Sequence, residues 1–86
     1  MVTPEAIQLY LSEKIDCEHL AVDGDGAHFQ AVIVAAAFTG KSRVQRHQIV
    51  YAALGDRMRE EIHALSMQTL TQVEWSQHDL NPVGNS

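Results

Sequence analysis

The chain has 86 residues, a net charge of −5 with neutral histidines, and a single cysteine. This length predicts one domain with a modest core, and one cysteine excludes an internal disulfide or a zinc site built from several cysteines. The acidic balance disfavours a general nucleic-acid binder, since contacts to phosphates supply most of the affinity of such proteins.

The sequence contains no segment that would cross or enter a membrane. No run of about 18 apolar residues occurs, and the first ten residues have neither the basic nor the apolar part of a secretory signal. We therefore expect a soluble protein that stays in the cytoplasm and has no membrane partner.

The first third of the chain predicts one helix and a hairpin. Thr3-Pro4 is a typical helix start, and the apolar residues that follow recur at four-residue spacing. From His19 the period changes to that of a strand, and a second strand is expected over 27–37. The Asp-Gly-Asp-Gly stretch at 23–26 between them predicts a tight turn.

The second half opens with a capped helix. Ser42 and Gln45 have the spacing of a capping box, and Gly55 is a plausible end for the helix. Asp56 can cap one further helical turn. A strand is expected over 62–70, and it carries His63 near its start.

A second capping box, Thr71 to Glu74, predicts a final helix that brings Trp75 onto the core. We expect the domain to span 1–78 and to be followed by a flexible tail at 79–86.

The expected order is α-β-β-α-(short α)-β-α in a single small domain. A strand that is reached through a helical crossover is expected to run parallel to its predecessor. The fold class is therefore α+β, with a three-stranded mixed sheet packed by helices, similar to the type II KH topology. No nucleophile with a base at motif spacing, no P-loop and no dinucleotide fingerprint occurs, so the sequence does not indicate an enzyme or a catalytic residue.

Several segments, taken together, resemble the BolA family. These are the F-x-G-K-S-x-V-Q-R-H stretch from Phe38 to His47, the I-V-Y-x-x-L stretch at 49–54, and I-H-A-L-S-M-Q-T-L-T at 62–71 followed by Glu74-Trp75. The short G-D-G-x-H-F-Q hairpin at 24–30 is similar to the IbaG-like branch of that family. Gln72 departs from many members, which have proline there.

This resemblance implies a non-enzymatic protein that is a monomer or weak homodimer when alone and that pairs with a monothiol glutaredoxin. The pair holds a bridging [2Fe–2S] cluster, with roles in iron–sulfur cluster trafficking and iron homeostasis. Glutaredoxin and glutathione supply thiolates, and the BolA side supplies a histidine at the position of His63 with a second ligand from the loop between the first two strands. His28 is the available residue for that second position.

Each histidine also has a simpler interpretation. His63 could be a partly buried strand residue bonded to neighbouring backbone, and His28 a cross-strand surface residue. We expect Cys17 to be a small packed residue, His47 a structural histidine and His78 a solvated one.

Lys41, Ser42, Arg43 and Arg46 form a small basic cluster at a helix start. It could bind glutathione, an acidic partner surface or a phosphate, or it could be a solvated helix start. The family also includes transcriptional regulators linked to stress. The alternative function is therefore DNA binding through the helix-turn-helix-like segment from Ser42.

Overall fold

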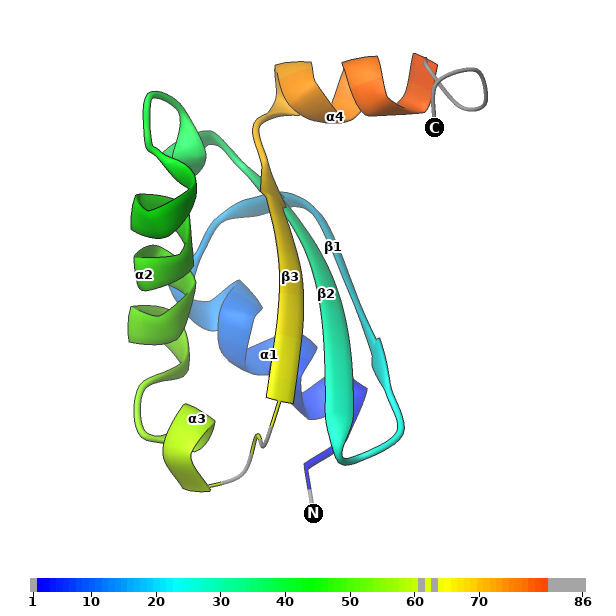
Figure 1. Cartoon of the computed structure of the whole chain (residues 1–86), viewed down its shortest axis with the longest axis vertical. Coiled ribbons are helices and arrows are strands. Elements are labelled where there is room, and N and C mark those ends of the chain that lie inside the picture. The colour runs from blue at the N-terminus through cyan, green and yellow to red at the C-terminus, as the bar shows by residue number, and fades with distance from the viewer. Residues whose placement is uncertain (1, 61, 63, 81–86) are drawn as a thin grey trace.

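The computed structural model describes residues 2–60, 62 and 64–80, and within them the chain folds in the expected element order (Figure 1). The elements are α1 (Pro4–Lys14), β1 (Cys17–Gly24), β2 (His28–Ala35), the 3₁₀ helix η1 (Ala36–Phe38), α2 (Arg43–Leu54), α3 (Arg57–Glu60), β3 (Ala64–Leu70) and α4 (Gln72–Leu80).

The sheet has the mixed topology that the sequence predicts. Its strand order is β1-β2-β3, with β1 antiparallel to β2 and β2 parallel to β3. The crossover through α2 and α3 therefore delivers β3 beside the central strand β2. This confirms an α+β fold with a three-stranded mixed sheet.

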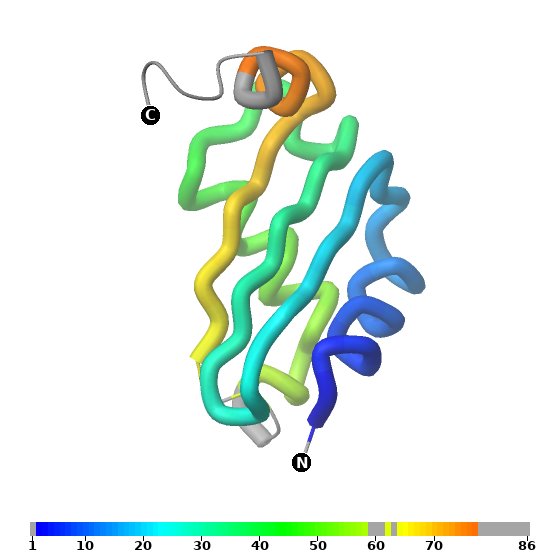
Figure 2. The backbone as a smooth tube through the Cα atoms, turned by 90° about the vertical axis from the view of Figure 1, so that its right-hand side faces the viewer, coloured from blue at the N-terminus to red at the C-terminus, as the bar shows by residue number. Residues whose placement is uncertain are grey.

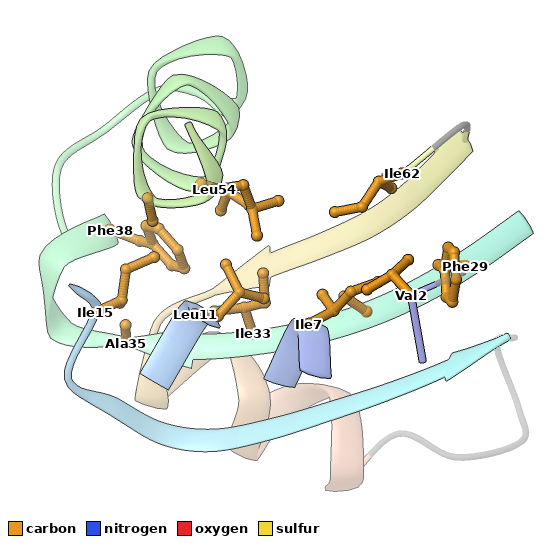
Figure 3. Packing of buried hydrophobic residues seen from close by; sticks show 13 residues of the cluster. Val2, Ile7, Leu11, Ile15, Phe29, Ile33, Ala35, Phe38, Leu54 and Ile62 are labelled. Carbon is orange, nitrogen blue, oxygen red and sulfur yellow. The ribbon is translucent and has the colours of Figure 1, made fainter. Parts of the chain in front are cut away.

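One face of the sheet is covered by helices α1 and α2, and the core lies between these layers (Figure 3). Phe29 and Ile33 of β2 point into it, because alternate residues of a strand face the same side. Ile7 and Leu11 of α1 and Leu54 of α2 meet them, each fully buried. The four-residue spacing seen in the sequence is therefore the inner face of α1.

The opposite face of the sheet is largely open, and Figure 2 shows it from the front. Of the described helices, α4 alone lies on this side, across the end of the sheet where β3 finishes (Figures 1 and 2). Val34, which alternation places on this face, is fully buried, whereas Gln30 and Gln68 remain exposed. The sheet thus has one covered end and one open end on this face.

The predicted helix starts are confirmed by their hydrogen bonds. The Thr3 hydroxyl accepts a bond from the Ala6 N–H at 3.1 Å. Ser42 and Gln45 form a complete capping box, and Thr71 and Glu74 form a second one. Local sequence therefore fixes where three helices begin.

Some boundaries differ from the expectation. β2 ends at Ala35, two residues before the expected end, because the chain turns into η1 and buries Phe38 completely. β1 begins at Cys17 rather than His19. Helix α4 continues through Leu80, two residues into the segment expected to be a tail, since 77–80 contain neither glycine nor proline. Residues 81–86 lie outside the described part.

No helix among the described residues has the length and apolar character needed to cross a membrane.

Candidate functional site

The hairpin turn between β1 and β2 fixes the backbone of His28. One carboxylate oxygen of Asp25 accepts hydrogen bonds from the N–H groups of Ala27 and His28, each at 2.9 Å. The Asp25 N–H in turn donates to the His28 carbonyl at 3.2 Å. Gly24 allows this close turn, because a Cβ there would lie 2.5 Å from the His28 carbonyl oxygen. The turn is therefore held by side-chain and backbone bonds together.

The same bonds explain the acidity of Asp25. Hydrogen bonds from the backbone N–H groups of His28 and then Ala27 lower the pKa of its carboxyl group. The carboxylate accordingly stays ionised at neutral pH and keeps both acceptor bonds.

His28 is the first residue of the central strand β2, so it lies at the hairpin end of the sheet, next to the start of β3. Its side chain is exposed, and in the parallel ladder His28 is level with Ala64. His63, the predicted cluster ligand, lies outside the described residues, directly before Ala64 in the chain. The register therefore brings the predicted loop ligand, His28, beside the residue that follows the predicted strand ligand.

The described residues offer only part of a metal-binding set. Within them, no group of three or more His, Cys, Asp or Glu side chains is placed to hold a metal ion. An exposed imidazole such as that of His28 fits the donor type that can replace thiolate on one iron of a [2Fe–2S] centre. Donor atoms from another molecule would have to complete such a site.

The predicted basic cluster divides into two parts. Lys41 and Arg43 are exposed, as the prediction of a partner-binding or anion-binding surface requires. Ser42 is already engaged in its capping box: its hydroxyl accepts from the Gln45 N–H at 3.2 Å, and its own N–H donates to Gln45 Oε1 at 2.9 Å. Anion binding through Lys41 and Arg43 stays a prediction.

Arg46 does not join Lys41 and Arg43 as a free cation. Its Nε donates to the Lys41 carbonyl at 3.0 Å, and its Nη1 donates to the Thr69 carbonyl at 2.9 Å. Both terminal nitrogens also bind the Glu74 carboxylate, at 2.7 and 3.2 Å. Arg46 therefore joins α2, the end of β3 and the start of α4, because its side chain points along the sheet edge toward α4 rather than to solvent.

The pairing also sets the acidity of Glu74. The hydrogen bonds from Arg46, followed by the backbone bond from Thr71, lower the pKa of Glu74 from 4.5 to about 2. The sequence pattern predicts a capping role for Glu74 at the start of the final helix, but not an arginine partner. Its arginine partner is 28 positions away, and no local pattern signals a pair at that separation.

The remaining histidines and the cysteine have other surroundings. The His19 ring stacks on the Trp75 ring of α4, with centroids 4.6 Å apart, and His47 meets Tyr51 edge-on. The Cys17 thiol is half-buried and donates to the Ile15 carbonyl at 3.4 Å. Burial, with a smaller effect of Asp16, raises the pKa of this thiol, as befits a packed cysteine. The side chain of His78 lies outside the described part.

The chain is similar in sequence to known proteins. The family model described as BolA-like protein matches residues 2–74, and the chain belongs to this family. It is similar to acid stress protein IbaG of Escherichia coli K12, with 38% identity over 71 residues that cover 81% of this chain and 84% of the relative. It is also 40% identical over 57 residues to the DNA-binding transcriptional regulator BolA of Haemophilus influenzae, covering 66% of this chain and 55% of that protein.

Solved structures show the same fold. A BolA homologue from Coxiella burnetii superposes with a TM-score of 0.80 at 38% identity, covering 88% of this chain and 99% of that one. The BolA domain of SufE1 from Arabidopsis thaliana gives a TM-score of 0.74 at 32% identity, covering 83% and 93%. In SufE1 this fold is a domain of the protein.

Proposed function

We propose that this protein is a non-enzymatic adaptor that pairs with a monothiol glutaredoxin in the cytoplasm and shares a bridging [2Fe–2S] cluster with it. The proposal rests on membership of the BolA-like family together with one geometric observation, the register that sets exposed His28 level with Ala64. His63 is the first proposed ligand and His28 the second. Iron–sulfur cluster trafficking and iron homeostasis are the proposed roles.

The hairpin end of the sheet suits a ligand that has to be shared. The backbone of His28 is held by Ala64 of β3 on one side and by Asp25 of the turn on the other, while its side chain is exposed to a partner. The Asp25 bonds to the backbone of His28 limit the movement of this residue, so a partner meets a preformed surface. Glutaredoxin and glutathione would supply the thiolates that the described residues lack.

Neutral imidazole is the form that binds iron, so complex formation is expected to weaken as histidine becomes protonated. A [2Fe–2S] cluster with a histidine ligand has a higher reduction potential than one held by thiolates alone. The part of this chain is to place the imidazoles and to provide the surface on which the partner docks.

The test is a titration of [2Fe–2S]-loaded monothiol glutaredoxin, in the presence of glutathione, with this protein. Visible absorption and visible circular dichroism report the ligands of the cluster, and gel filtration reports the complex. We expect a saturable spectral change that is lost in His63→Ala and reduced or shifted in His28→Ala. No spectral change with the unmodified protein, together with no complex on gel filtration, would overturn the proposal.

The matched control is His19→Ala. This histidine is also exposed and also lies on a strand, but it pairs with Val34 near the opposite end of the ladder from His28. Its loss should leave the cluster spectrum unchanged. Far-UV circular dichroism of all three variants shows whether each one is folded.

A second candidate is a DNA-binding regulator of a stress response, because a relative from Haemophilus influenzae carries the name DNA-binding transcriptional regulator. The exposed cations at the start of α2 are Lys41 and Arg43, while Arg46 is committed to Glu74. Binding through this helix would weaken steeply with salt and fail in a Lys41→Gln, Arg43→Gln double variant. Cluster sharing is instead expected to fail in His63→Ala.

A further inference from the structure

We propose that the open face of the sheet carries a binding site for the oxyanion of a small organic ligand, a carboxylate or a phosphate ester, with Arg43 as its cation. His28 does not line this site, which does not depend on the proposed cluster. It occupies a cavity of about 460 Å³ between β2, β3 and the start of α2. Cavities of this size hold small-molecule ligands in other proteins.

The ladder shows how the lining side chains are grouped. Gln30 is level with Ser66, and Val32 is level with Gln68. Because Phe29 and Ile33 point into the core, these alternate residues face the open side of the sheet. Two carboxamides, one hydroxyl and the apolar side chain of Val32 thus lie together on this face, and Ala31 and Met67 complete the lining contributed by the two strands.

The charged group in the lining is a cation, and the other polar groups of the lining are neutral. Arg43 supplies a guanidinium group at the β3 side of the cavity, and no carboxylate contributes to the lining. Among the described residues, Gln30, Ser66, Gln68 and Arg43 make no side-chain hydrogen bond or ion pair with one another or with other groups. Asp23, which is level with Gln30 on β1, lies outside the lining.

This combination matches an oxyanion with polar substituents. A guanidinium group binds carboxylate or phosphate through two parallel N–H bonds, and carboxamides and a hydroxyl can both donate and accept around it. Val32 offers an apolar contact for the body of the ligand. A purely apolar ligand would cover these exposed polar groups without replacing their bonds to water, and a cation would be repelled by Arg43.

The experiment follows backbone and side-chain amide signals of the ¹⁵N-labelled full chain by NMR during titration with four probes. N-acetylglycine carries a carboxylate, AMP a phosphate ester, and inorganic phosphate the bare anion, while N-acetylglycinamide is the neutral control. We expect saturable shifts at Gln30, Ser66 and Gln68 with N-acetylglycine or AMP and none with the neutral probe. The probe that binds more tightly shows whether the ligand class is a carboxylate or a phosphate ester.

The decisive variant is Arg43→Gln, which should weaken binding by about tenfold or more. Lys41→Gln is the matched control, because Lys41 is an exposed cation two residues before Arg43 that does not line the cavity. Equal weakening in both variants, shifts spread over all cationic residues, or no saturable shift with either organic anion would overturn the site. If the protein does not share a cluster with glutaredoxin, oxyanion binding at this site is still expected.

Discussion

Arg46 and Glu74 form a two-point ion pair, at 2.7 and 3.2 Å, that holds helix α4 to helix α2. The same guanidinium group binds the carbonyl oxygens of Lys41 and Thr69, so its position is fixed from three directions. The pair lies at the end of the sheet where β3 finishes and α4 begins. It is a polar connection between α4 and the elements α2 and β3.

Replacing Arg46 with alanine should therefore destabilise the protein. The change removes charge-assisted bonds and leaves two carbonyl groups without this donor, but the Glu74 side chain is 41% exposed, so solvent screens part of the effect. We expect a loss of about 2 kcal/mol in the free energy of unfolding. Urea denaturation measures it, with Arg43→Ala as the control that should stay within about 0.5 kcal/mol. Equal losses in both variants would contradict the assignment.

The pair also predicts a dependence of stability on acid. The pKa of Glu74 is lowered in the folded state from 4.5 to about 2, so its contribution is complete above the unfolded value and is lost as pH falls through this window. In Glu74→Gln the capping bonds can persist but the charge is absent. The unmodified protein should lose more of its unfolding free energy between pH 5 and pH 3 than this variant does. Parallel losses would show that Glu74 does not carry the effect, since the lowered pKa of Asp25 is common to both proteins.

The parts of the fold that could be predicted are those that depend on neighbours in sequence. The capping boxes at Ser42 and Thr71 are each complete within four residues, and both are confirmed. The predicted hairpin forms as well, but its turn lies at 25–27 rather than 23–26, because β1 continues through Gly24. The parallel pairing of β2 with β3 followed from the general geometry of crossovers. None of these required knowledge of the folded state.

The site was less predictable for a physical reason. In the sequence, Arg46 is one of three cations at a predicted helix start. Its partner Glu74 is 28 positions away and becomes its neighbour only in the folded structure. The cavity at Arg43 likewise combines Gln30 and Gln68, which are on different strands and show no motif. The prediction for His63 lies outside the described residues and remains a prediction.

The His19–Trp75 stack provides an independent measure of how α4 is held. Trp75 is the single tryptophan of the chain, so the tryptophan emission reports the surroundings of this one ring, which include His19. In His19→Ala the ring that covers it is removed, and we expect a red-shifted emission with a loss of about 1 kcal/mol in the free energy of unfolding. His28→Ala is the control, because that exposed histidine is at the opposite end of β2 from Val34, the partner of His19. An unchanged emission spectrum in His19→Ala would show that the stack does not form in solution.

Gly24→Ala should distort the turn that carries His28. The added Cβ would lie 2.5 Å from both the His28 carbonyl oxygen and a ring carbon of Phe29, and Phe29 is a core residue that is 1% exposed. Relief of this clash has to move the strand backbone or the ring, so we expect a loss of about 2–3 kcal/mol in the free energy of unfolding. Hydrogen exchange of the Ala27 and His28 amides should also accelerate as their bonds to Asp25 weaken.

Gly40→Ala is the control that separates the effect of the steric clash from the effect of placing alanine in a glycine backbone conformation. Gly40 has φ of +76° with open space around it, so that variant should cost only about 1 kcal/mol and leave both amides protected. If Gly24→Ala costs no more than Gly40→Ala and the two amides exchange at the unmodified rate, the turn is not the rigid support for His28 described above.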